Sequence, residues 1–161
     1  MSSSARVVEA THLVTLAALT GLVGLDPTAR LRSAPDYAGW LAGQQRVDRV
    51  MSRVAPPLFL SAAATAVGAA LVAGAGHRPA LAVSRIVAAT CVAVAVRVTL
   101  TVNEPANARL RAWRPDAVPP DDWRAVRARW DEGHRQRRVL VAAGAAAVTL
   151  GLLVDRRFRR G

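Results

Sequence analysis

The chain has 161 residues, about the length of one domain. Its apolar fraction of 52% comes mostly from Ala, Val and Leu, with only two Phe and one Tyr, which argues against a large aromatic core of the soluble kind. The net charge of +11 comes from 22 arginines, and these flank apolar blocks instead of forming one basic face. We therefore expect contact with a lipid bilayer and no nucleic-acid partner.

Four apolar segments approach the length of a transmembrane helix, which is roughly 20 residues for a hydrocarbon core about 30 Å thick. They cover about residues 7–25, 55–75, 79–102 and 139–154. The first is followed by no clean small-x-small cleavage site, so we expect it to be retained. Backbone groups in lipid must be satisfied within the protein. We predict one all-α domain over 1–161, a four-helix transmembrane bundle in a bacterial cell membrane.

The connections between these segments also carry structure. Residues 37–54 place apolar side chains at helical spacing, which predicts an amphipathic helix at the interface or capping the bundle. The short connection from Gly76 to Arg78 predicts an antiparallel hairpin. The fourth helix is expected to begin near Trp123, with Asp121 or Asp122 as its N-cap, and to run on into the membrane.

Polar side chains gather where this extended helix meets the membrane. One helical face carries residues at spacings of three or four: Trp123, Val126, Trp130, His134, Arg137 and Val141. Asn103 and Asn107 lie four apart at the exit of the third segment, with Pro105 between them to bend or end the helix. Unsatisfied polar groups at this depth are costly, so we expect them to point into the protein or a wet cavity.

Each of these residues also has a structural interpretation. Trp123 and Trp130 are typical interfacial anchors, Arg137 is typical of a flanking charge, and Asn107 suits a helix C-cap. His134 suits either a satisfied interfacial side chain or a proton-transfer group. Arg97, inside the third segment, indicates either a functional site or an ion pair with Glu104 or Glu9.

Metal binding is the weaker interpretation of the acidic residues. Glu9 with His12 and Asp131 with His134 have the i, i+3 spacing of di-iron bundles, and Glu104 could bridge. The full set needs one more inward carboxylate, so we expect no metal and no cofactor. The single cysteine forms no internal disulfide or thiolate cluster, and no nucleotide-binding, serine hydrolase or zinc-protease motif is present.

Two phrases carry a family resemblance. Pro105, Asn107 and Leu110 form Pro-x-Asn-x-x-Leu, and Arg129, Trp130, His134 and Arg137 form Arg-Trp-x-x-x-His-x-x-Arg, with Trp113 between them. Over residues 103–138 the chain resembles the small four-helix membrane proteins related to fungal anthrone (noranthrone) oxygenases.

The resemblance implies a cofactor-independent monooxygenase acting on an electron-rich polycyclic phenol such as an anthrone. We assign His134 as the base, Arg137 and Asn107 as stabilisers of the phenolate or peroxide, and Trp130 as a stacking wall. Further substrate contacts are assigned to four residues: Asn103, Trp113, Trp123 and Arg97. The competing hypothesis is a non-catalytic membrane protein that binds a lipophilic small molecule or a partner. A small multidrug-type transporter is a third class, with Glu9 as its candidate acid.

Overall fold

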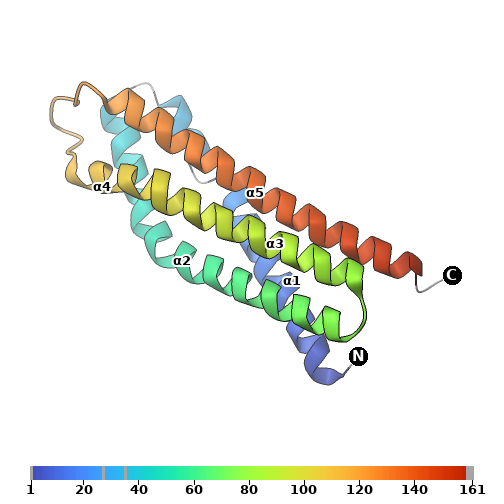
Figure 1. The fold of residues 1–161 in the computed structure, drawn as a ribbon. Coiled ribbons are helices and arrows are strands. Elements are labelled where there is room, and N and C mark those ends of the chain that lie inside the picture. The colour runs from blue at the N-terminus through green and yellow to red at the C-terminus, as the bar shows by residue number, and fades with distance from the viewer. Residues whose placement is uncertain (1, 27, 35, 159–161) are drawn as a thin grey trace.

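The computed structural model describes residues 2–26, 28–34 and 36–158, and within them the fold is all-helical. The elements follow in this order: α1 (Ser3–Gly24), η1 (Ala29–Ser33), α2 (Tyr37–Ala75), α3 (Pro79–Val98), η2 (Thr99–Asn103), α4 (Glu104–Ala112) and α5 (Trp123–Phe158). Figure 1 shows the long helices side by side in one bundle, with α4 and the start of α5 at the end away from both termini. The predicted all-α bundle is confirmed.

Among the described residues, four helical segments are long and apolar enough to cross a membrane. They are α1, α2, α3 with its continuation through α4, and α5. Large aliphatic side chains on these helices point outward, including Val14 at 68% exposure and Leu71 at 70%. Outward aliphatic side chains over several helices are the surface that lipid, not water, would cover. The predicted membrane helices therefore have the expected length and composition.

Helix α2 is longer than the sequence suggests. Residues 37–54 are helical as predicted, but they are the first half of a continuous 39-residue helix instead of a separate element. Asp36 caps it by accepting a hydrogen bond of 2.7 Å from the Gly39 amide. Pro56 and Pro57 lie inside the helix and remove two backbone donors, and the helix changes direction in its teal part in Figure 1. Whether the first half lies at a lipid interface stays a prediction.

The third segment continues where Pro105 was expected to bend or end the helix. Pro105 does not end the helix, because five residues of π-helix, Thr99–Asn103, join α3 directly to α4. The amide of Glu104 donates to the carbonyl of Thr99, five residues back. This wider turn accommodates the proline at the start of α4, where its missing donor is tolerated. Such π-turns inside helices often occur at functional sites.

Helix α5 starts at Trp123 as predicted and continues for 36 residues. Its membrane half lies close to α3: a Cβ added to Gly144 would lie 3.4 Å from the Cys91 Cβ and 3.5 Å from the Ala88 Cα. The other end of the bundle is held by an aromatic cluster that includes Tyr37, Trp40 and Trp123, all buried. The Gly76–Arg78 turn forms the predicted hairpin between α2 and α3. The candidate site lies between this aromatic cluster and the aliphatic core.

Candidate active site

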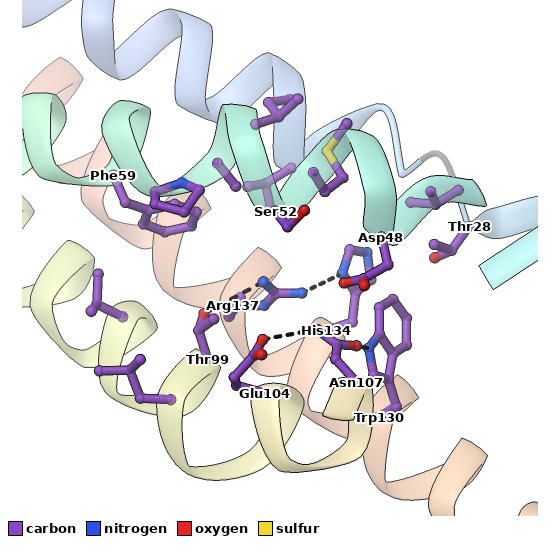
Figure 2. A pocket seen from close by; sticks show the side chains of 18 of the residues that line it. Thr28, Asp48, Ser52, Phe59, Thr99, Glu104, Asn107, Trp130, His134 and Arg137 are labelled. Carbon is purple, nitrogen blue, oxygen red and sulfur yellow. Dashed lines mark hydrogen bonds between the residues drawn. The ribbon is translucent and has the colours of Figure 1, made fainter. Parts of the chain in front are cut away.

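A pocket of about 500 Å³ opens between the two cores. Such a volume is within the range of about 300–1,000 Å³ usual for small-molecule sites. Its apolar wall comes mainly from α1, α2 and α3: Leu22, Val23, Val47, Met51, Ala55, Pro56, Phe59, Leu60, Val96 and Leu100. Its polar residues include Gln44, Asp48 and Ser52 of α2 and a group facing them from η2, α4 and α5: Thr99, Glu104, Asn107, Trp130, His134 and Arg137 (Figure 2). The four residues predicted to be catalytic therefore line one cavity.

His134 and Arg137 are in direct contact at this wall. Arg137 Nη2 lies 3.1 Å from His134 Nδ1, as the dashed line in Figure 2 marks. A guanidinium can only donate, so Nδ1 must accept and carries no proton. The neutral ring then holds its proton on Nε2. His134 presents the nitrogen that can receive a proton towards Arg137 and the cavity.

Arg137 is a partly buried cation with few protein partners. Its Nη1 donates weakly to the Thr99 hydroxyl at 3.4 Å, and its buried Nε has no hydrogen-bond partner among the described residues. Within those residues no carboxylate forms an ion pair with it. An unpaired charge of this kind is costly to bury. An anion entering the cavity would find a donor group with spare hydrogen-bonding capacity.

Asn107 and Trp130 form the next contact along the wall. The Trp130 indole N–H donates to Asn107 Oδ1 at 2.7 Å, and Asn107 Nδ2 lies 3.4 Å from Glu104 Oε2. The Trp130 ring stacks on the His134 ring, with centroids 5.2 Å apart and planes 10° apart. Asn107 is therefore not a helix C-cap, since it lies within α4 and holds the indole in place. Trp130 in turn fixes the plane of the imidazole.

The far side of the His134 ring meets an aspartate that the sequence interpretation missed. Asp26 Oδ1 lies 3.1 Å from His134 Nε2, an ion-pair distance without the alignment of a full hydrogen bond. The Thr28 hydroxyl donates to the same oxygen at 2.7 Å, and Arg138 Nη1 donates to Asp26 Oδ2 at 3.1 Å. Asp26 follows the end of α1 and is 5% exposed. The sequence offered one signal, an acidic residue directly after the first apolar segment in a chain with only 11 acidic residues.

Two further carboxylates belong to the pocket. Asp48 of α2 and Glu104 of α4 both bind the Arg111 guanidinium, Asp48 at 3.0 Å. The sequence suggests Glu104 as a partner for Arg97 or a metal, whereas it places Asp48 and Gln44 only on the polar side of an amphipathic helix. Gln44 is 2% exposed and lines the cavity. The roles of these residues depend on how α2 turns against α4, which helical spacing alone does not specify.

The residues predicted as further substrate contacts do not line this cavity. Asn103 is 1% exposed and donates to the Trp130 carbonyl at 3.0 Å, so it ties η2 to α5. Trp113 and Trp123 pack on Tyr37, with ring centroids 6.2 and 5.5 Å from it, inside or beside the aromatic cluster. Arg97 is exposed, and Glu104 and Glu9 pair with Arg111 and Arg85 instead.

The candidate di-iron ligands are not assembled into one cluster. Glu9 pairs with the fully buried Arg85, and Asp131 lies 4.0 Å from Arg127. Across residues 2–26, 28–34 and 36–158, no group of three or more His, Cys, Asp or Glu side chains is placed to hold a metal ion.

Comparison with known proteins agrees with the motifs. The family model described as anthrone oxygenase matches residues 47–147, which is more than half of the chain. The matched segment contains the whole polar wall of η2, α4 and α5. No curated protein and no solved structure matches the chain. From its family match and its four apolar helices, we conclude that the chain belongs to the anthrone oxygenase family.

Proposed function

We propose that the protein is a cofactor-independent monooxygenase that oxidises an anthrone-like polycyclic phenol within a bacterial cell membrane. The supporting observation is the pairing of His134 and Arg137 in a largely apolar cavity. There, a neutral imidazole with an available lone pair adjoins a partly buried cation that lacks a carboxylate partner among the described residues. Family membership supports this reaction class, and the cavity offers an apolar place for the reaction.

The chemistry begins with loss of a proton from the substrate. His134 Nδ1 takes the proton, and the resulting anion spreads its charge over the fused rings. For this to happen, Arg137 turns from Nδ1 to the substrate oxygen, where it stabilises the developing phenolate. The contact at 3.1 Å in the free protein holds both groups ready for this exchange.

The anion then supplies the electrons that oxygen needs. One electron passes from the anion to O₂, and the two radicals combine into a carbon-bound peroxide. Breaking the O–O bond with loss of the second hydrogen from the same carbon leaves a ketone and one water. The net change is one CH₂ group and one O₂ converted to one C=O group and one H₂O, so no external reductant is required. In this scheme Asn107 and Arg137, which both line the cavity, donate to the developing peroxide oxygen.

The test is oxygen consumption by the purified protein with a panel of anthrones. We expect one O₂ per ketone formed, unchanged by a chelator, and a loss of at least about 10²-fold in kcat for His134→Gln, because the general base is gone. The matched control is His77→Asn in the exposed α2–α3 turn, where Asn tolerates the backbone φ of 51°.

Other outcomes would point elsewhere. Chelator-sensitive turnover would move the reaction to a metal. Tight binding of anthrones without oxygen uptake would favour the non-catalytic binding protein. Full turnover in His134→Gln would remove histidine from the mechanism.

A further inference from the structure

We propose that Asp26 is a positioning residue for His134: it turns the ring so that Nδ1 faces the cavity, and it stabilises the imidazolium that forms when His134 accepts a proton. The catalytic part of this inference rests on the proposed function. Asp26 lies outside residues 47–147, the segment shared with the family model. Its pairing with His134 therefore joins a residue outside the matched segment to one inside it.

The geometry of the Asp26 carboxylate supports this role. One oxygen, Oδ1, contacts His134 Nε2 at 3.1 Å and accepts from the Thr28 hydroxyl at 2.7 Å. The other, Oδ2, accepts from Arg138 at 3.1 Å. His134 and Arg138 are one turn apart on α5, so one carboxylate contacts two successive positions on the same helical face. With 5% exposure, Asp26 interacts with the imidazole through little water.

The placement of the ring proton also brings Asp26 into the reaction. Arg137 on the cavity side leaves Nδ1 as an acceptor, so the proton of the neutral ring lies on Nε2, the nitrogen facing Asp26. When Nδ1 takes a proton from the substrate, the ring becomes a cation with N–H groups on both sides. Asp26 stays ionised and balances that charge. The proton later leaves Nδ1 for the peroxide oxygen, and the neutral ring is restored.

Other charges around the ring make this counter-charge important. Arg137 and Arg138 of α5 both disfavour a positive ring. Asp48 of α2 and Glu104 of α4 belong to the same cavity, but both are bound to Arg111. Among the described acids of the site, Asp26 is the one in direct contact with the imidazole. It supplies the attraction that lets a ring between two arginines act as a base.

The backbone at Asp26 has an uncommon conformation. Its φ is 42°, in the left-handed region that few side chains other than Asn and Asp adopt. Strained positions of this kind are enriched at functional sites. This conformation also provides clean variants, because Asn keeps the shape and tolerates the backbone, and Gly adopts it freely. Both variants remove the negative charge and are compatible with the backbone conformation at this position.

The direct test is ¹⁵N NMR of detergent-solubilised protein labelled at histidine. The chain has three histidines, and the His134 signals are those lost in His134→Gln. In the wild type we expect Nδ1 unprotonated and Nε2 protonated near neutral pH. In Asp26→Asn the midpoint of His134 protonation should fall by about one pH unit or more, because the neighbouring negative charge is absent. An unchanged midpoint would overturn the proposal, and Asp26→Gly provides the same test if Asp26→Asn does not fold.

Kinetics with an anthrone supply the second readout. Asp26→Asn should lower kcat by about 10²–10⁴-fold with KM little changed, as for other aspartates that orient a catalytic histidine. The acid limb of its pH profile should move to lower pH, and Asp26→Glu should recover part of the rate. The matched control is Asp116→Asn, an exposed acid paired with Arg114.

The two proposals fail in different ways. If no anthrone is oxidised but the His134 midpoint falls in Asp26→Asn, the oxygenase assignment fails and the Asp26–His134 coupling stands. If the wild type turns over and Asp26→Asn keeps its kcat and pH profile, the coupling is wrong and the oxygenase assignment stands.

Discussion

Single side chains at the cavity wall are each held by a specific neighbour. Trp130 stacks on His134, Asn107 holds the Trp130 indole, and Asn103 holds the Trp130 carbonyl. The imidazole is thereby fixed in plane by an aromatic ring and at its edge by Asp26. A proton acceptor fixed in this way loses little freedom when substrate arrives, which favours proton transfer.

Arg137 gives a prediction at this scale. Arg137→Gln should lower kcat for an anthrone by about 10²–10³-fold, since a donor aimed at the developing oxyanion is lost. The kcat of Arg137→Lys should lie between those of the wild type and Arg137→Gln, because Lys keeps the charge but lacks the planar pair of donors. Steady-state oxygen uptake measures both.

Arg135→Gln is the control for this prediction, since Arg135 lies two residues away on α5 and is exposed and paired with Glu132. Equal losses in Arg135→Gln and Arg137→Gln would indicate a general charge effect instead of a role in the cavity.

The helical spacing of polar residues in the sequence explains which side chains of the site could be predicted. The sequence predicted that four side chains meet: Asn107, Trp130, His134 and Arg137. Each lies on a helical face that carries another polar residue and reaches the membrane boundary. Asp26 was not predicted, because it lies in a turn without periodicity, and its partner is more than 100 residues away in sequence.

At the scale of elements, the π-turn η2 decides which side chains reach α5. Arg97 and Glu104 are seven apart and would share a face of an ideal α-helix. One extra residue in the turn between them rotates the next helix, α4, by about 100°. Glu104 and Asn107 line the cavity, while Arg97 is exposed. Hydropathy correctly predicted a membrane helix here, but the sequence pattern assumes a uniform turn and so misplaced the arginine.

The close approach of η2 and α5 gives a prediction. A Cβ on Gly133 would lie 2.6 Å from Asn103 Oδ1 and 2.9 Å from Val102 Cγ1, too near unless these side chains or the helices shift. Gly133→Ala should therefore lower the free energy of unfolding by about 1–3 kcal/mol, despite the better helix propensity of Ala. Denaturant unfolding in detergent, followed by circular dichroism, measures it.

The matched control is Gly21→Ala on α1, where an added Cβ meets nothing within 4 Å and should leave stability unchanged or slightly raised. If Gly133→Ala and the wild type unfold with the same free energy, the contact between η2 and α5 can widen without loss of stability.

At the scale of the whole molecule, the bundle has two structurally different halves. The half nearer the termini is an aliphatic four-helix core, whereas the other end combines aromatic packing with a cavity. Helix α5, at about 54 Å for 36 residues, is longer than the hydrocarbon core of about 30 Å. One helix therefore serves both halves, with His134 in the part beyond the aliphatic run.

Occupancy of the cavity should stabilise the molecule as a whole. A quinone that mimics the product, at about 100 times its Kd, should raise the free energy of unfolding by about 2.7 kcal/mol. Ala55→Trp should abolish this gain because Ala55 lines the cavity. Thermal unfolding in detergent, with and without the quinone, provides the measurement.

Val67→Trp is the control, since Val67 is 51% exposed on the same helix. A quinone-induced shift that survives in Ala55→Trp would place the ligand somewhere other than the cavity.

The ion pair between the buried Arg85 and the partly exposed Glu9 anchors α1 in the bundle. Arg85 is fully enclosed, and Glu9 lies in the N-terminal half of α1, whereas Asp26 follows the C-terminal end of the helix. Sixteen residues, nearly all of them helical, separate the two acids by about 25 Å, so α1 connects them as a stiff element. A shift or rotation of α1 along its axis therefore moves both ends of the helix together. The anchor that fixes how deep α1 sits in the bundle therefore also sets the distance between Asp26 and the imidazole it faces.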